Sequence, residues 1–208
     1  MGKTKQTKQA HVVMFVEGDT DELFFKALLE HYRRHSNGPM LPCSVCNLKG
    51  VTRYTSKLLA KLKNEYLPDA RKKDVRIQTI CCSYDTDVFE AKNPLIVDWK
   101  SLEKSIKRLG VDTLVRIGVK SSIEDWILDD TDGICSFLKL KAVPRSLKGN
   151  DGFLKLSDLY ATAKRTYQKG YAICELISAL DMDKIIQKRK DVLQELEAAL
   201  GIVPFTNK

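Results

Sequence analysis

Residues 11–25 read HVVMFVEGDTDELFF, and this stretch decides the fold. Its first six residues form a short apolar run rich in β-favouring side chains, which predicts a buried strand that ends at Glu17–Gly18. Beyond that turn, apolar residues recur at helical spacing as far as Tyr32, and residues 36–39 break the pattern. Thr20 is expected to cap this helix. The stretch therefore predicts a buried strand followed directly by a helix.

The same alternation of strand and helix continues along the chain. Further strands are expected at 42–48, 75–83 and 113–119. Between them, a helix carrying Leu58 and Leu62 is expected to close at Pro68, and a second helix is expected at 100–109. This alternation predicts an α/β fold with a mostly parallel four-stranded sheet and helices on both faces. In such sheets, ligands bind outside the carboxyl ends of the strands.

After Ser122 the alternation stops and only helical patterns follow. Helices are expected at 123–128, 133–140, 153–166, 172–180 and 190–200. Three acidic residues in this part, Asp129, Asp130 and Asp132, are expected to lie in a solvated loop. We therefore predict a basic N-terminal arm (1–10), one α/β domain (11–145), and a helical C-terminal extension packed on it (146–208).

The composition is that of an ordinary globular protein, with 208 residues, 43% hydrophobic and 30% charged. No apolar run approaches the roughly 20 residues that span a bilayer, and residues 1–9 lack the apolar core of a signal peptide. These features predict a cytoplasmic protein without membrane partners. The formal net charge of +8 favours a polyanionic partner such as nucleic acid, although a distributed charge of this size can simply maintain solubility.

The six cysteines do not suggest a disulfide framework. Cys81 and Cys82 are adjacent inside an apolar run, and a cytoplasmic chain would keep them reduced. Cys43 and Cys46 form a C-x-x-C pair, but no second pair or histidine follows at the spacing of a zinc site. We therefore expect no structural zinc.

Acidic side chains follow three of the expected strands. The carboxyl ends of parallel strands meet at one edge of a sheet, so these groups should converge, and their repulsion favours a bound cation. Carboxylate oxygens select Mg²⁺ or Mn²⁺ rather than zinc, and such ions can orient a phosphodiester and activate water. The groups are Glu17 with Asp21, Asp85 with Asp87, and Glu124 with Asp125.

Each acidic pair also has a simpler interpretation. Glu17 and Asp21 could serve the positive end of a helix, and Glu124 and Asp125 could be another helix start. Asp85 and Asp87 could occupy an ordinary turn. The occurrence of all three pairs at strand ends favours the metal site. Gly18 would leave room for a close backbone approach, and an extended Asp85-x-Asp87 would place both carboxylates on one side.

These motifs resemble the TOPRIM family. The run VEGDTDELFF (16–25), followed after a strand and a helix by SYDTD (83–87), is similar to the TOPRIM pattern over residues 12–126. That fold is shared by topoisomerases, bacterial primases, an rRNA-maturing ribonuclease and the OLD-family nucleases. The segment SSIEDW (121–126) is similar to small TOPRIM and OLD-type proteins, which implies that Glu124 joins the metal site.

The resemblance implies a role for each matching residue. Glu17, Asp85 and Asp87 would be catalytic as well as metal-binding, with Asp21 and Glu124 completing the ligands and Ser83 and Ser122 as neutral neighbours. OLD-type sites also use a late lysine, which Lys169 resembles. No ATPase, topoisomerase tyrosine domain or primase zinc module is recognisable in the sequence, so the resemblance predicts a catalytic core without a pathway.

Cations near the site would contact the nucleic-acid backbone. Lys49 and Arg53 flank Gly50, and Lys164 and Arg165 lie in FLKLSDLYATAKRTYQKG (153–170), which also contains two tyrosines. The alternative is an amphipathic helix whose lysines are solvated.

The sequence supports three functions. The first is a Mg²⁺-dependent nuclease acting on DNA or RNA, which the resemblance associates with bacterial defence or mobile elements. The second is a non-catalytic nucleic-acid-binding module that works with an ATPase partner, and the third is a primase-type nucleotidyl transferase.

Overall fold

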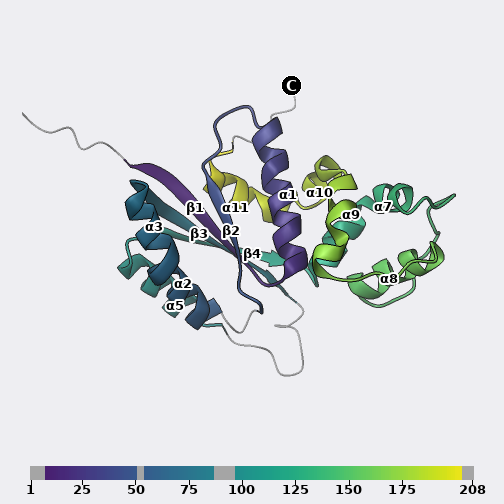
Figure 1. The fold of residues 1–208 in the computed structure, drawn as a ribbon, viewed down its shortest axis with the longest axis horizontal. Coiled ribbons are helices and arrows are strands. Elements are labelled where there is room, and N and C mark those ends of the chain that lie inside the picture. The colour runs from purple at the N-terminus through teal and green to yellow at the C-terminus, as the bar shows by residue number, and fades with distance from the viewer. Residues whose placement is uncertain (1–7, 51–53, 87–96, 203–208) are drawn as a thin grey trace, which may run out of the picture.

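The computed structural model describes residues 8–50, 54–86 and 97–202. Its centre is a four-stranded, all-parallel sheet in the order β2-β1-β3-β4 (Figure 1). The four predicted strands are confirmed, and two of them extend further than the apolar runs indicated. Their bounds are β1 Gln9–Val16, β2 Cys43–Asn47, β3 Val75–Asp85 and β4 Thr113–Val119.

Alternate residues of β1 enter two separate apolar clusters, one on each face of the sheet. Val12, Met14 and Val16 face the first cluster, while Val13 and Phe15 face the second. This is the geometry of a strand, in which successive side chains point to opposite faces. All five side chains are fully buried, which explains why the strand is an unbroken apolar run.

The second face is covered by the helices that precede β3 and β4. A continuous helical run extends from Tyr54 to Lys72 as η2 (Tyr54–Leu58), α2 (Leu59–Lys61), η3 (Leu62–Tyr66) and α3 (Leu67–Lys72). The predicted end at Pro68 is wrong, because the helical run continues through this proline, which lies directly after the point where η3 meets α3. Helix α5 (Trp99–Arg108) confirms the helix expected at 100–109.

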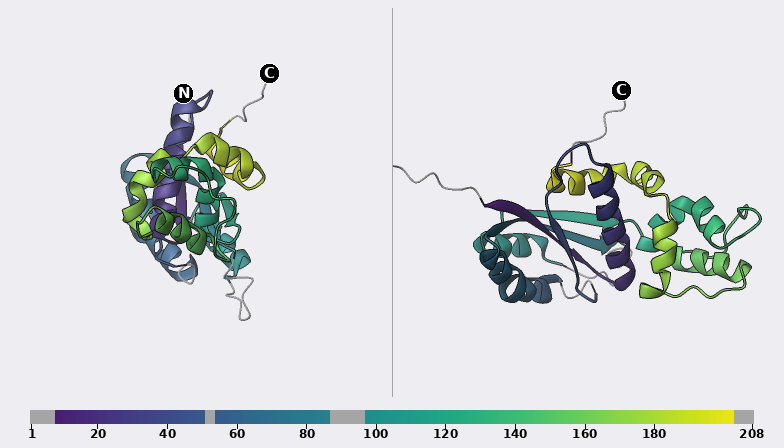
Figure 2. Two further views of the ribbon diagram at one scale, coloured as in Figure 1. Left: turned by 90° about the vertical axis from the view of Figure 1, so that its right-hand side faces the viewer. Right: turned by 45° about the horizontal axis from the view of Figure 1, so that its top comes forward.

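The first face is covered by α1 (Asp19–His35) and by the helices after β4 (Figures 1 and 2). The α11 helix packs against β4, whereas α7, α8 and α9 extend beyond the carboxyl end of the sheet (Figure 2). The helices are α6 (Ile123–Ile127), η4 (Leu128–Asp130), α7 (Thr131–Phe137), α8 (Gly152–Thr162), η5 (Gly170–Ile173), α9 (Cys174–Ala179), α10 (Met182–Lys188) and α11 (Lys190–Leu200).

Three local expectations are corrected here. Gly18 is the residue that precedes α1, so Thr20 lies inside the helix, and its hydroxyl accepts the Gly170 N–H at 2.9 Å. Helix α8 ends at Thr162 instead of 166, and Lys164 follows it with a φ of 58°. The α10 helix was not anticipated.

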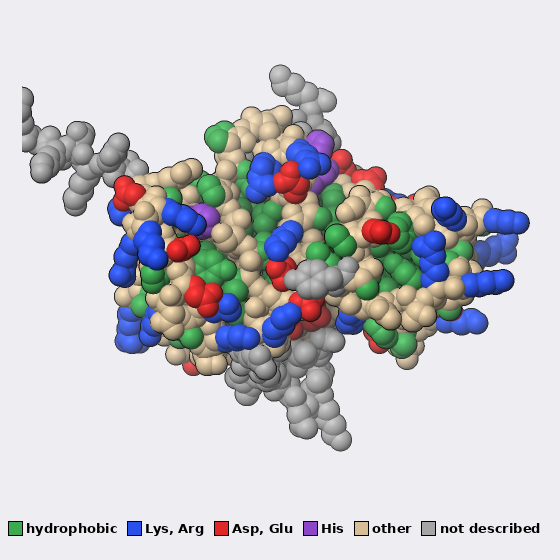
Figure 3. All heavy atoms as spheres, viewed as in Figure 1, with side chains coloured by type: hydrophobic (Ala, Val, Ile, Leu, Met, Phe, Trp, Pro, Cys, Tyr) green, Lys and Arg blue, Asp and Glu red, His purple; other side chains and the backbone are tan. Residues whose placement is uncertain are grey.

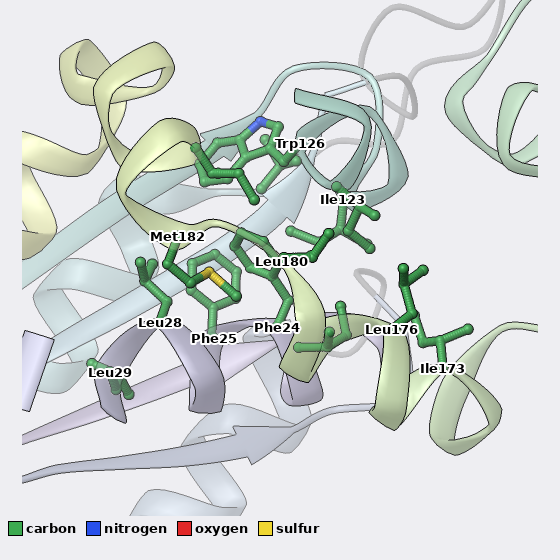
Figure 4. Close-up of a cluster of buried hydrophobic side chains, with 14 of the residues drawn as sticks. Phe24, Phe25, Leu28, Leu29, Ile123, Trp126, Ile173, Leu176, Leu180 and Met182 are labelled. Carbon is green, nitrogen blue, oxygen red and sulfur yellow. The ribbon is translucent and has the colours of Figure 1, made fainter. Parts of the chain in front are cut away.

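An aromatic cluster joins α6 to α1 (Figure 4). The ring of Trp126 contacts those of Phe24 and Phe25 edge-on, with centroids 6.1 and 6.2 Å apart. Leu180, which follows α9, and Met182, the first residue of α10, lie against the same cluster (Figure 4). Because Trp126 is fully buried there, the short α6 helix has a defined position relative to the start of α1.

Residues on both sides of position 145 share this apolar cluster. The helical extension therefore packs on the sheet, while the boundary at 145/146 stays a prediction. Among the described residues, no helix combines the length and the apolar character needed to cross a bilayer. Cys43 and Cys46 are free thiols that contact different apolar clusters, one on each face of the sheet.

Candidate functional site

A cleft of about 290 Å³ opens at the carboxyl edge of the sheet, where β1 and β3 end. It brings together residues from five parts of the chain that are far apart in sequence. The lining residues are Glu17, Gly18, Asp19, Thr20, Asp21, Gly50, Asp85, Ile123, Glu124, Lys169 and Gly170. Five predicted site residues, Glu17, Asp21, Asp85, Glu124 and Lys169, are therefore neighbours in space.

Glu17 connects the ends of β1 and β3. It directly follows β1, and its Oε1 accepts the backbone N–H of Asp85 at 3.2 Å. Asp85 is the last residue of β3, which continues two residues beyond the end at Ser83 that the sequence predicted. Both carboxylates are half-buried at the edge of the cleft.

Asp21 occupies the first turn of α1 and is buried, with 5% of its surface exposed. Burial raises the pKa of this carboxyl to about 7, and the nearby charge of Glu124 acts in the same direction. Backbone hydrogen bonds and the charge of Lys169 oppose the shift without cancelling it. A Cβ at position 18 would lie 3.0 Å from Asp21 Oδ2, so Gly18 gives this carboxylate room.

Glu124 lies on α6 and is fully buried. Its Oε1 lies 3.0 Å from Lys169 Nζ and accepts the phenol O–H of Tyr167 at 3.3 Å. Burial raises the pKa of Tyr167, and the charge of Glu124 raises it further, so the phenol stays a proton donor. The neighbouring Asp125 has a local role, because its Oδ2 accepts the backbone N–H of Ser122 at the start of α6.

Two glycines bring the helical extension against the acidic cleft. A Cβ on Gly152 would lie 2.6 Å from the Asp125 backbone nitrogen, so only glycine lets α8 approach α6 this closely. Gly170 has a φ of +79°, and a Cβ there would meet Asp19 at 3.3 Å. The turn at Gly170 therefore places Lys169 beside Glu124 in the cleft.

Asp19 and Lys49 form an ion pair at the edge of the cleft. Asn47 at the end of β2 supports it, since its amide donates to Asp19 Oδ1 at 2.8 Å and its carbonyl oxygen accepts the Lys49 N–H at 2.8 Å. Lys49, predicted as a phosphate contact, therefore lies beside the cleft with a carboxylate partner. Asp19 is a cleft residue that the sequence interpretation missed, because an acid at a helix start has an ordinary explanation.

The remaining predicted residues lie elsewhere. Asp87 and Arg53 are outside the described residues. Lys164 and Arg165 follow the end of α8 and do not line the cleft. Ser122 serves the start of α6, and Ser83 lies buried in β3 outside the cleft lining. Tyr167, which the sequence marked only as an aromatic between cations, directly contacts Glu124.

The donor chemistry of the cleft suits a hard divalent cation. Asp21 Oδ1 and Glu124 Oε2 are buried and have no hydrogen-bond partner among the described residues. Buried carboxylate oxygens in this condition are costly unless a cation or donor satisfies them. Within residues 8–50, 54–86 and 97–202, however, no three acidic, histidine or cysteine side chains are already arranged to hold a metal ion.

Comparison of the chain with protein-family models, with curated proteins and with solved structures gives no match.

Proposed function

We propose that this protein hydrolyses phosphodiester bonds of DNA or RNA with Mg²⁺ or Mn²⁺ as the cofactor. The observation that supports the proposal most is one cleft that contains the four predicted carboxylates Glu17, Asp21, Asp85 and Glu124 together with Lys169. Among the described residues, Asp21 and Glu124 each have a buried oxygen without a hydrogen-bond donor. The TOPRIM resemblance names the same residues independently of the cleft. The formal charge of +8 fits a polyanionic substrate.

The carboxylates and the lysine of the cleft would have different roles. Glu17, Asp21, Asp85 and Glu124 would hold the cation, with Asp87 as a further ligand implied by the resemblance. When bound, Mg²⁺ polarises a phosphoryl oxygen and lowers the pKa of water. The ammonium of Lys169, whose side chain is 55% exposed, can reach a phosphate while it stays beside Glu124, and it would stabilise negative charge that develops there.

The contacts of Glu124 with Tyr167 and Lys169 orient its carboxylate in the cleft. Tyr167 and Lys169 both contact Glu124 Oε1, which leaves Oε2 directed to other partners. A cation that binds Oε2 would offset part of the desolvation of this buried carboxylate. Burial also lets Asp21 exist partly protonated near neutral pH, so cation binding there would release a proton.

Two variants test the proposal in single-turnover cleavage with Mg²⁺ or Mn²⁺. Glu124→Gln and Lys169→Met should each slow cleavage about a hundredfold or more, because the first removes the charge of a proposed cation ligand and the second removes the positive charge proposed to lie beside the reacting phosphate. Binding measured in Ca²⁺ should fall much less for Lys169→Met. Glu175→Gln is the matched control, since Glu175 is an exposed acid on α9 outside the cleft, and it should cleave at the wild-type rate.

A non-catalytic nucleic-acid-binding module is the second candidate. The observation that favours it is the lack, in the described part of the chain, of three side chains already set to bind a metal. Under that function, the protein binds nucleic acid in Ca²⁺ and Mg²⁺ alike and cleaves in neither, with or without an ATPase partner. Product that grows only when nucleoside triphosphates are added would instead indicate the primase-type transferase. Either result would overturn the nuclease proposal.

A further inference from the structure

Exposed large apolar side chains are concentrated in one part of the described chain. Those with more than a third of their surface exposed are Val143, Phe153 and Leu154, at 44%, 37% and 45%. All three belong to the segment that connects α7 to α8 or to the first turn of α8. An exposed aromatic ring in such a place is a candidate contact surface.

The same part of the chain carries an excess of positive charge. The basic segment, residues 139–169, contains eight Lys and Arg but only two Asp. Lysine and arginine side chains gather at the right-hand end of the molecule in Figure 3, where Figure 1 places α7 and α8. Seven of these cations form no ion pair with a described carboxylate, and they are Lys139, Lys141, Arg145, Lys148, Lys155, Lys164 and Arg165.

Phe153 links this basic segment to the acidic cleft. The ammonium of Lys169 lies over its ring, 5.3 Å from the centroid, and the same ammonium lies 3.0 Å from Glu124 Oε1. The close approach at Gly152 sets the position of Phe153, because the preceding residue touches the backbone of α6. The ring therefore contacts Lys169, which lines the cleft.

The ring of Phe153 packs against a row of two buried aromatic rings. Its centroid lies 5.5 Å from that of Tyr167, which in turn lies 5.3 Å from that of Tyr160. Tyr167 and Tyr160 are buried, so the row leads from the core to the one exposed ring at its end. A ring held in this way is a platform whose position is set before a ligand arrives.

From these observations we infer that the basic segment is a nucleic-acid-binding surface and that Phe153 stacks on a nucleobase beside the phosphate held at Lys169. This inference depends on the proposed function for its phosphate site. Stacking on a side chain requires a base that is not stacked on its neighbours. The preferred substrate is therefore a single strand or an unpaired region rather than an intact duplex.

Charge and geometry select nucleic acid over other anionic partners. Unpaired cations along the segment match a phosphate backbone, and an aromatic ring beside the phosphate-binding lysine matches the neighbouring base. An anionic membrane would also attract the cations, and Val143, Phe153 and Leu154 could enter it. Membrane binding is therefore an outcome that the experiment must test.

The experiment measures equilibrium binding in Ca²⁺ to a single strand, to the matching duplex and to a strand of equal length built from abasic units. Phe153→Ala should weaken binding to the single strand about tenfold, because base–aromatic stacking is lost. Its effect on the duplex and on the abasic strand should be less than twofold. Phe153→Tyr retains the ring and should bind like the wild type.

Leu154→Ala is the matched control, since Leu154 is the adjacent exposed apolar residue and has no ring to stack. It should bind the single strand within twofold of the wild type, with unchanged circular dichroism in both Ala variants. Lys164→Gln combined with Arg165→Gln should lower the slope of log affinity against log salt by about 1.4, or 0.7 for each lost contact.

Equal loss on all three nucleic acids in Phe153→Ala would overturn the stacking role. Binding to phosphatidylserine vesicles that exceeds binding to the single strand would overturn the choice of partner. All these binding measurements are made without cleavage. If the protein and its variants bind as expected but no cleavage is ever observed with Mg²⁺ or Mn²⁺, only the nuclease proposal is contradicted.

Discussion

Two buried carboxylates on the same side of the sheet, Asp21 and Asp130, differ in how they are satisfied. Asp130 is 2% exposed, and it accepts the N–H of Asp181 at 2.9 Å, the N–H of Gly133 at 3.2 Å and the Lys184 ammonium at 3.1 Å. Burial alone would raise its pKa, but these donors outweigh burial and lower it. Asp21 has a similar exposure, yet its pKa is raised to about 7.

The difference separates a structural acid from a functional candidate. The donors around Asp130 join η4, α7 and α10, so its charge holds the helical extension together. Asp21 keeps an oxygen without a partner among the described residues and lines a cleft. A group whose ionised form is left destabilised by its own fold is a candidate for ligand binding.

The largest change in the free energy of unfolding is expected for the substitution of Asp130. Asp130→Asn should lower the free energy of unfolding by about 3 kcal/mol, because it leaves buried backbone N–H groups and Lys184 with a weaker acceptor. Urea unfolding at pH 7.5 measures this. The control is Asp132→Asn, which affects the same lysine through a carboxylate whose side chain is 71% exposed and should cost less than about 1 kcal/mol. Equal losses would remove the contrast between the two acids.

Asp21→Asn in metal-free protein is expected to raise the free energy of unfolding, by less than Asp130→Asn lowers it. The folded-state pKa of about 7 exceeds the ordinary value of 3.8, so the folded protein binds more protons between these values. Wild-type stability should therefore fall as pH rises from about 4 to 7, and the variant should lose that slope and gain about 2 kcal/mol at pH 8. Unfolding free energies measured at pH 5 and pH 8 test this. Parallel pH profiles would contradict the raised pKa.

The smallest change in stability is expected for the substitution of Tyr167, whose hydroxyl donates a hydrogen bond to Glu124. Tyr167→Phe keeps the ring contacts with Phe153 and Tyr160 but leaves Glu124 without this donor, so it should cost about 1 kcal/mol in thermal unfolding. Tyr160→Phe is the matched control, because the Tyr160 hydroxyl has no described side-chain hydrogen bond, and it should cost less than about half as much. Similar losses for both tyrosines would show that packing, not the Glu124 contact, determines the effect.

The α/β fold could be predicted from the sequence because its signals are local. The run HVVMFV is apolar at every position, which occurs in strands buried on both faces, and the alternation with helical patterns determines that neighbouring strands are parallel. The placement of Glu17, Asp21 and Asp85 at one edge follows from the same rule, because parallel strands end on one side.

Features that depend on contacts distant in sequence could not be predicted. The acids of residues 129–132 resemble a solvated loop, yet Asp129 pairs with Arg189 and Asp130 is buried among donors from α7 and α10. Only packing of the extension reveals these partners.

The sequence by itself determined the sheet, the edge that carries the acids and the charge of the chain. Only the tertiary structure decided that Lys169 and Tyr167 meet at Glu124, that Asp125 serves the start of α6, and that Phe153 lies beside the cleft. The physical reason is that strand and helix periodicity arises from neighbouring residues, whereas these contacts depend on the close approach of α8 to α6 at Gly152, set by packing across the fold.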